Sequence, residues 1–269
     1  MFMKRNFWLS KCTIGFLRTV ISLVIFLNAA SVRADPPESG WRLTFSDDFN
    51  GADLDTNKWN TCYWWASSGC KLSGDMETQW YQPDDVIVQN GKVHLRAQQR
   101  SVNGYKYTSG MISSHDKYAF QYGYAEIRAK LPKGKGLWPA FWLIPQQRNV
   151  WPPELDVMEY LGHDPKGVYM TVHYKTDTGN GNSGTYWNGP DFSARYHTFA
   201  LQWEPNRIIW YVDGVERKRY QVAENIPAQP MHIVANLAVG PAWTNTPPNS
   251  TTPFPSYYDI DYIKVWQRN

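Results

Sequence analysis

Hydrophobic and polar residues alternate with a period of two along several short segments, and turn-forming residues separate these segments. Such alternation is typical of β-strands that bury one face and expose the other. Segments with this alternation, or with runs of β-branched and aromatic residues, are 93–97, 124–131, 168–174, 207–212, 231–239 and 259–266. No segment longer than a few turns combines a helical period with capping residues. The pattern therefore predicts an all-β protein, and so many short strands favour an antiparallel β-sandwich.

Nothing in the sequence divides this β-rich region into separate domains. The dipeptides Asn90-Gly91 and Asp213-Gly214 are hairpin signals, so neighbouring strands follow one another closely. There is no internal repeat, no Ser- or Gly-rich linker and no change of composition after residue 35. All-β sandwiches often reach about 200–250 residues as one unit. We therefore expect residues 35–269 to form a single domain.

The first 34 residues have the pattern of an export signal. Positive residues come first, an apolar run follows at 20–27, and small residues occupy 32–34 except for Arg33. The alternative is a transmembrane anchor, but Arg18 interrupts the apolar region and a span needs about 18 apolar residues. We therefore predict a signal peptide over 1–34. The mature protein is then expected outside the cytoplasm, secreted or periplasmic, with no membrane attachment after cleavage.

Removal of this segment changes the charge of the protein. The whole chain has 27 basic and 24 acidic residues, and a formal net charge of +3. Five of the basic residues and none of the acidic ones lie in 1–34. The remaining chain thus keeps 22 basic against 24 acidic residues, a net charge of −2. Without a basic stripe, a nucleic-acid partner is not expected.

Aromatic residues are unusually frequent, with 14 Trp and 17 Tyr, while charged residues make up only 19% of the chain. A disordered chain would show the reverse composition, so disorder is excluded. So many rings exceed what a core needs, and aromatic faces are what proteins stack against the C–H faces of sugars. The composition therefore favours a carbohydrate ligand.

Two of the three cysteines remain in the predicted mature chain. Cys62 and Cys70 are eight positions apart, and in an exported protein they most simply form one disulfide. A metal site is disfavoured, because no second Cys or His pair stands nearby. The disulfide would close a loop that contains Trp64 and Trp65. We interpret this as stabilisation of the loop, with contact between these two rings and a ligand as the alternative.

One strand-like segment, Glu154-Leu-Asp-Val-Met-Glu159, holds three carboxylates. In a regular strand Glu154 and Asp156 share a face, and Glu159 lies on the other. A β-bulge within Val157-Met158 would return Glu159 to their face. The outer pair would then be near the roughly 5–5.5 Å of a retaining glycosidase, and mutual repulsion would raise one pKa. The alternative is an edge strand with solvated acids, which the apolar flanks disfavour.

The segment resembles the E-x-D-x-x-E signature of glycoside hydrolase family 16. Further segments are similar to that family in the same order, namely 46–51, 133–143, 161–165, 171–173, 236–240 and 261–265. The resemblance implies a concanavalin-like β-jelly-roll sandwich with a glycan-binding cleft on its concave face. It also implies retaining hydrolysis of internal β-linkages without a catalytic cofactor. Carried onto this chain, Glu154 is the nucleophile, Glu159 the acid/base, and Asp156 holds the charge state of the nucleophile.

Within that family the chain looks most like laminarinase-type enzymes that cut β-1,3 or mixed β-1,3/1,4 glucans. Two departures are Tyr124, where those enzymes commonly have Arg, and Met76, where they have Asn; we expect both positions near the cleft. Alternatives are depolymerisation of a succinoglycan-like exopolysaccharide or another β-galactan, cleavage of an acidic polysaccharide, and a lectin-like sandwich without activity. The intact carboxylate set argues against the lectin.

The resemblance also suggests substrate contacts. Trp138, Trp142 and Trp243 are expected as sugar platforms, with core aromatics as the alternative. Glu126 lies where the family often places a hydroxyl-binding carboxylate, and a surface ion pair is the alternative. His173 is expected at the wall of the −1 subsite rather than as a structural histidine.

The family often carries a structural Ca²⁺. By position its oxygens would come from Asp48, the carbonyl of Gly91 and Asp261, residue types suited to this ion. Acids that cap strand ends are the alternative. The expected partner is a β-glucan polysaccharide, and the expected oligomeric state is a monomer.

Overall fold

The computed structural model of this chain describes residues 1, 36–65, 70–71 and 76–269. Every element described below belongs to one compact unit, residues 34–269. Apart from Met1, the predicted signal peptide lies outside the described residues. Within the described part of the chain, no helix is both long and apolar enough to cross a membrane.

The described residues form strands and three short 3₁₀ helices. The helices are η1 (Pro83–Asp85), η2 (Ala223–Asn225) and η3 (Ala242–Thr244). The strands are β1 (Trp41–Asp47), β2 (Gln79–Tyr81), β3 (Val86–Val88), β4 (Val93–Ala97), β5 (Tyr107–Ser109), β6 (Met111–Ser113), β7 (Ala119–Phe120), β8 (Gly123–Lys130), β9 (Leu137–Pro145), β10 (Glu154–Tyr160), β11 (Gly167–Thr176), β12 (Gly179–Asn188), β13 (His197–Glu204), β14 (Arg207–Val212), β15 (Val215–Tyr220), β16 (Met231–Val239) and β17 (Ser256–Arg268). All six segments predicted from the sequence coincide with or overlap a strand.

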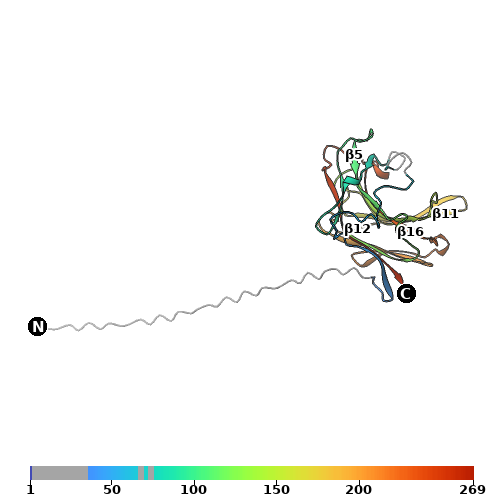
Figure 1. Cartoon of the computed structure of the whole chain (residues 1–269). Helices are drawn as coiled ribbons and strands as arrows, with labels where there is room; N and C mark the ends of the chain where they lie inside the picture. Colours follow the sequence, from blue (N-terminus) through green and yellow to red (C-terminus); the bar gives the residue numbers. More distant parts are fainter. Residues whose placement is uncertain (2–35, 66–69, 72–75) are drawn as a thin grey trace. The chain divides into compact units, whose positions relative to one another are not determined.

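Two large sheets lie face to face (Figure 1). The back sheet has the order β15-β14-β13-β8-β17-β4-β3, and β1 also pairs with β17. The front sheet has the order β12-β11-β10-β9-β16-β6, and β7 also pairs with β16. Neighbouring strands in both sheets run antiparallel, whereas the small β2–β5 pair is parallel. The predicted antiparallel sandwich is thus confirmed.

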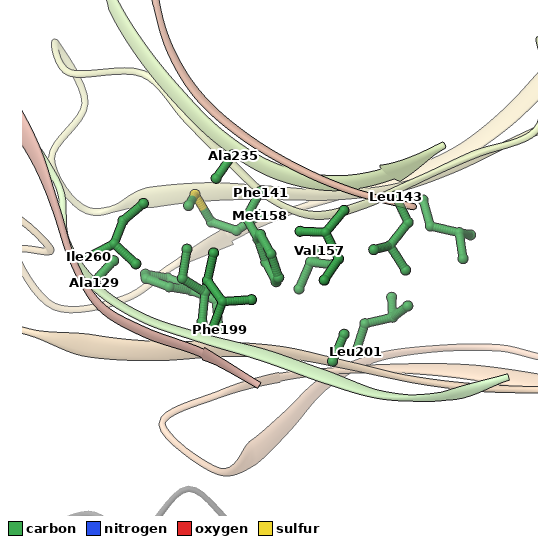
Figure 2. Close-up of a cluster of buried hydrophobic side chains, with 14 of the residues drawn as sticks. Ala129, Phe141, Leu143, Val157, Met158, Phe199, Leu201, Ala235 and Ile260 are labelled. Atoms are coloured by element: carbon green, nitrogen blue, oxygen red, sulfur yellow. The ribbon is translucent and has the colours of Figure 1, made fainter. Parts of the chain in front are cut away.

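The core fills the space between the two sheets. On β8 the alternate residues Ala125, Ile127 and Ala129 belong to it, because strand side chains point to opposite faces in turn. Figure 2 shows Phe199 and Leu201 of the back sheet beneath the side chains of β10 in the front sheet. This layer fixes which face of each front-sheet strand is left for function.

Candidate active site

A break in the pairing of β10 puts its three carboxylates on one face. Against β9, Asp156 pairs with Trp142 and Met158 with Phe141, so Val157 is the extra residue of a β-bulge. Val157 and Met158 are both buried and both point into the core (Figure 2). Glu159 therefore returns to the face of Glu154 and Asp156, and the bulge expected from the sequence is confirmed.

These carboxylates lie at the floor of a cleft with a volume of about 660 Å³. Its lining comes from β9, β10 and β16 and from the connections that precede β2 and β10. The lining is rich in aromatic residues and comprises Tyr63, Trp64, Trp65, Met76, Glu77, Trp138, Ala140, Trp142, Ile144, Asn149, Val150, Trp151, Glu154, Asp156, Glu159 and Asn236. Aromatic walls around grouped polar residues are typical of a site for an organic ligand.

Each outer carboxylate accepts a hydrogen bond from an indole. Trp151 Nε1 donates to Glu154 Oε2 at 2.6 Å, and Trp138 Nε1 donates to Glu159 Oε1 at 3.2 Å. Both bonds favour the ionised carboxylate and so lower its pKa. The indoles therefore act on opposite ends of the carboxylate row.

The stronger influence on the three acids is burial, which raises all three pKa values. The pKa of Asp156 rises to about 7, and those of Glu154 and Glu159 rise well above their usual range. Repulsion from Asp156 adds to the effect of burial at both glutamates. Since like charges this close cannot all ionise, near neutral pH the row retains protons. A protonated acid beside an ionised carboxylate is what glycosidic cleavage needs.

Asp156, in the middle of the row, is held from several sides. His173 Nε2 lies 3.1 Å from Asp156 Oδ2, so the predicted histidine does reach the site. Trp210 of the back sheet crosses the core, and its Nε1 donates to the carbonyl of Asp156 at 2.8 Å. These contacts fix both the side chain and the backbone of the residue between the two glutamates.

A buried cation lies beneath the same strands. Lys218 of β15 is 8% exposed, and its Nζ donates to the carbonyls of Met170 (2.9 Å) and Ser183. Burial lowers the pKa of Lys218 to about 8, and the positive charge lowers the pKa of Asp156. Sequence analysis did not identify Lys218, which lies among the charged residues of β15, Val-Glu-Arg-Lys-Arg-Tyr.

Glu77 is a fourth buried carboxylate of the cleft that sequence reasoning missed. Its Oε2 accepts hydrogen bonds from Gln79 Nε2 at 2.6 Å and from the Tyr81 hydroxyl at 3.4 Å. Burial raises its pKa to about 7. Asn236 Nδ2 donates to the Tyr81 hydroxyl, and Asn236 Oδ1 accepts from Trp142 Nε1. In an extended segment Glu77, Gln79 and Tyr81 share one face. This spacing is the sequence feature that could have identified Glu77.

The three predicted tryptophans differ in exposure and in their position relative to the cleft. Trp138 and Trp142 both line the cleft, as their shared strand parity suggests. Trp142 is 8% exposed, whereas Trp243 is 44% exposed and lies beside the cleft. The ring centroid of Trp243 is 5.0 Å from that of Trp138, at an interplanar angle of 84°. Met76 also lines the cleft, as expected.

Glu126 and Tyr124 do not lie in the cleft, which corrects the expectation for both. They belong to β8 of the back sheet and point away from its core-facing side. Glu126 accepts hydrogen bonds from the hydroxyls of Tyr124 at 3.0 Å and Tyr262 at 2.7 Å. The family resemblance had put Glu126 near sugar hydroxyls, but the sheet to which β8 belongs excludes that contact.

The residues expected to bind Ca²⁺ do not fit that ion. Asp48 is paired with Lys264 at 2.7 Å, and Asp261 with Arg128 at 2.5 Å. A calcium site needs carboxylate oxygens that face the ion rather than a resident cation. Gly91 has a φ of +66°, a conformation that favours glycine, and an added Cβ would lie only 3.1 Å from Asn50 Oδ1. The turn at this position therefore accounts for the glycine. The alternative, an acid at a strand end, fits Asp48, which follows β1 directly, but not Asp261, which lies inside β17.

The predicted disulfide is confirmed, since Cys62 and Cys70 are bonded. Trp64 and Trp65, which follow Cys62, both line the cleft. The structure therefore supports the alternative in which these rings reach a ligand. In this respect the disulfide ties down part of the cleft wall.

Comparisons with known proteins give one consistent result. The sequence profile of "Glycosyl hydrolases family 16" matches residues 73–264. An endo-1,3-1,4-beta-glycanase, EglC, from Rhizobium meliloti is 36% identical over 242 residues, which cover 83% of this chain and 51% of that protein. A beta-glucanase from Rhodothermus marinus is 30% identical over 276 residues, covering 93% of this chain and 94% of that protein. This chain thus spans about half the length of the first relative and nearly all of the second.

A solved structure agrees in fold. The laminarinase catalytic domain from Thermotoga maritima superposes with a TM-score of 0.77 at 33% identity, covering 85% of this chain and 99% of that domain. The range that the family profile matches includes every strand of the front sheet, with the carboxylate strand β10 among them.

Proposed function

Because this chain belongs to glycosyl hydrolase family 16, we propose that it is a retaining endo-β-glucanase. Its substrates would be polysaccharides with internal β-1,3 or mixed β-1,3/1,4 bonds. The observation that carries the proposal is the bulge at Val157, which gathers Glu154, Asp156 and Glu159 on the floor of one aromatic cleft. A glycan-binding module would gain nothing from burying three acids together, because their desolvation is costly.

The proposed reaction has two chemical steps. Ionised Glu154 attacks the anomeric carbon while protonated Glu159 gives its proton to the departing glycosidic oxygen, which leaves a covalent glycosyl-enzyme. Glu159, now ionised, then takes a proton from a water that attacks the same carbon and releases Glu154. Asp156 lies between them, and burial raises its pKa to about 7, so it can exchange a proton with its neighbours near neutral pH. Two displacements at one carbon keep the β configuration.

The cleft favours a neutral glycan. None of its described lining residues is Lys or Arg, so nothing there matches the charge of an acidic or sulfated chain. Trp138, Trp142 and Trp151 offer ring faces or edges to sugars instead. The relatives named as β-glucanases and laminarinase point the same way.

Proton NMR of the products tests the proposal. The purified protein is incubated with laminarin, lichenan, agarose and a succinoglycan-type polymer, with Glu154→Ala as the control. We expect cleavage of laminarin or lichenan, a β anomer released first, and an inactive variant. An α anomer would imply inversion and a carboxylate separation of roughly 6.5–9.5 Å, and would reject the roles assigned to both glutamates. Cleavage of agarose or the succinoglycan-type polymer alone would reject the glucan substrate.

We further propose that the enzyme acts as a monomer outside the cytoplasm after removal of residues 1–34. N-terminal sequencing of the exported protein should begin at Asp35, and light scattering should give the mass of one chain. Family 16 glucanases need no cofactor for catalysis. Since Asp48 and Asp261 are paired with resident cations, dialysis against EDTA should leave the thermal midpoint and activity unchanged.

A further inference from the structure

An aromatic row continues from the cleft across the front sheet to its edge strand. We use this name for Trp243, Tyr169 and Tyr186. The ring centroid of Tyr169 lies 5.1 Å from that of Trp243 and 5.2 Å from that of Tyr186. In the strand register Tyr169 is opposite Glu159 on β10, and Tyr186 is opposite Tyr169 on β12. The two tyrosines therefore share the face that carries the acid/base carboxylate.

Tyr186 is exposed and yet held in place. Its side chain is among the most exposed large aromatics described, at 47%. Its hydroxyl donates a hydrogen bond to Asp164 Oδ2 at 2.8 Å. A Cβ on Gly167 would come within 2.4 Å of the Tyr186 ring, so only glycine leaves room for the ring in this position. A surface ring that is already oriented loses little entropy when a ligand stacks on it.

Tyr169 and Tyr186 lie on the side of β10 that the cleft does not use. The cleft lining comes from β9, β10, β16 and neighbouring connections, and no residue of β11 or β12 contributes to it. Beside Tyr186, the cleft-facing positions of β12 are Gly184 and Asn182, so this surface is low and polar rather than walled. The front sheet thus has a deep side and an open side, with the carboxylate row between them.

The chemistry of the acid says which part of the substrate belongs on the open side. Glu159 gives its proton to the oxygen that leaves, so the leaving sugar begins beside Glu159. On this inference the glycone, which stays bonded to Glu154 in the intermediate, lies in the deep cleft. A glycan chain that crosses the strands then passes its leaving portion over β11 and β12, where Tyr169 and Tyr186 lie.

We propose that Tyr169 and Tyr186, with Tyr186 fixed by Asp164 and Gly167, form the platform on which the leaving-group sugars of a neutral β-glucan stack. This inference rests on the proposed function and assigns residues to the side of the site that the cleft leaves open. Ring faces stack on sugars whatever their linkage, so the platform adds affinity for chain length rather than for one bond.

Two substrates distinguish binding of the leaving-group sugars from a role in the chemical step or in folding. Laminarihexaose needs sugars on both sides of Glu159, whereas 4-nitrophenyl β-laminaribioside has a nitrophenol leaving group and needs only the deep cleft. For Tyr186→Ala we expect kcat/KM on laminarihexaose to fall about 5- to 10-fold, the loss of one stacked face. Its kcat/KM on the nitrophenyl substrate should stay within about twofold of wild type. Tyr186→Phe keeps the ring and should lose much less on the hexasaccharide.

Tyr257→Ala is the matched control. Tyr257 is also a strand tyrosine, 38% exposed, but it lies on β17 of the back sheet. Its activity on both substrates should equal that of wild type. The inference is overturned if Tyr186→Ala loses activity equally on both substrates with an unchanged thermal midpoint, or loses none on the hexasaccharide. If wild type cleaves neither substrate, the proposed function itself fails, and this assignment fails with it.

Discussion

Replacing Trp151 with Phe removes one hydrogen bond from the nucleophile and little else. The indole Nε1 donates to Glu154 Oε2 at 2.6 Å, while the ring itself is 52% exposed and has little packing to lose. The bond favours ionised Glu154, so its loss raises the pKa of that carboxyl. Since Glu154 must be ionised to attack, the variant should lose activity at a higher pH than wild type as the pH is lowered.

The size of the shift follows from the exposure of the indole. Hydrogen bonds to charged groups contribute about 1.5–3 kcal/mol. Water competes at a half-exposed ring, so the lower end applies, and one pH unit corresponds to about 1.4 kcal/mol. We therefore expect the acid limb of the kcat/KM profile to move up by about one pH unit, while the plateau stays within about twofold.

Trp138→Phe is the matched test on the other glutamate. Trp138 Nε1 donates to Glu159 Oε1 over a longer 3.2 Å, and its loss raises the pKa of Glu159. Glu159 must be protonated, so here the alkaline limb should move up, by less than one unit. Reducing-end assays on lichenan between pH 3 and 10 measure both limbs. If Trp151→Phe moves the alkaline limb, or both variants move the same limb, the assignment of nucleophile and acid is wrong.

Three further outcomes are expected. Trp243→Ala should lower kcat/KM on polymer by roughly 1 kcal/mol, or about fivefold, without changing the thermal midpoint of this 44% exposed residue; a collapse of the midpoint would make it structural. Burial lowers the pKa of Lys218 to about 8, so the unfolded chain binds that proton more tightly. The unfolding free energy of wild type should therefore rise by up to about 3 kcal/mol relative to Lys218→Met between pH 8 and 10.5. If urea denaturation gives the same difference in unfolding free energy between the two proteins at both pH values, this prediction is wrong. Thiol titration of the denatured, unreduced mature protein should find no free thiol, because Cys62 and Cys70 are bonded; two thiols would refute it.

Spacing along one strand was enough to predict the site geometry. Glu159 has the opposite parity to Glu154 and Asp156, so the three acids can share a face only if an extra residue lies near Val157, and the structure has it there. The disulfide and the strand segments were equally local features. Each could be predicted because the deciding physics acts within about ten residues.

Contacts between sheets could not be predicted in this way. Strand parity correctly separates Glu126 from Ala125 and Ile127, but it does not say to which sheet β8 belongs or what its polar face meets. Lys218 looks like its charged neighbours until β15 is placed over the carbonyls of Met170 and Ser183. Such partners depend on the order of the strands in the two sheets, which cannot be predicted from the sequence of one strand.

The extra residue in β10 also sets how this gene can change in length. Losing the one codon for Val157 would remove the extra residue and restore strict alternation, with Met158 still in the core and Glu159 still on the face of Glu154 and Asp156. Losing the codon for Leu155 would instead put Glu154 and Asp156 on opposite faces, and a carboxylate turned into the core without partners is costly. Substitutions of Val157 by similar apolar residues keep the frame and are mild by comparison. Along β10, a change of length is therefore compatible with the carboxylate row at the bulge, but not between Glu154 and Asp156.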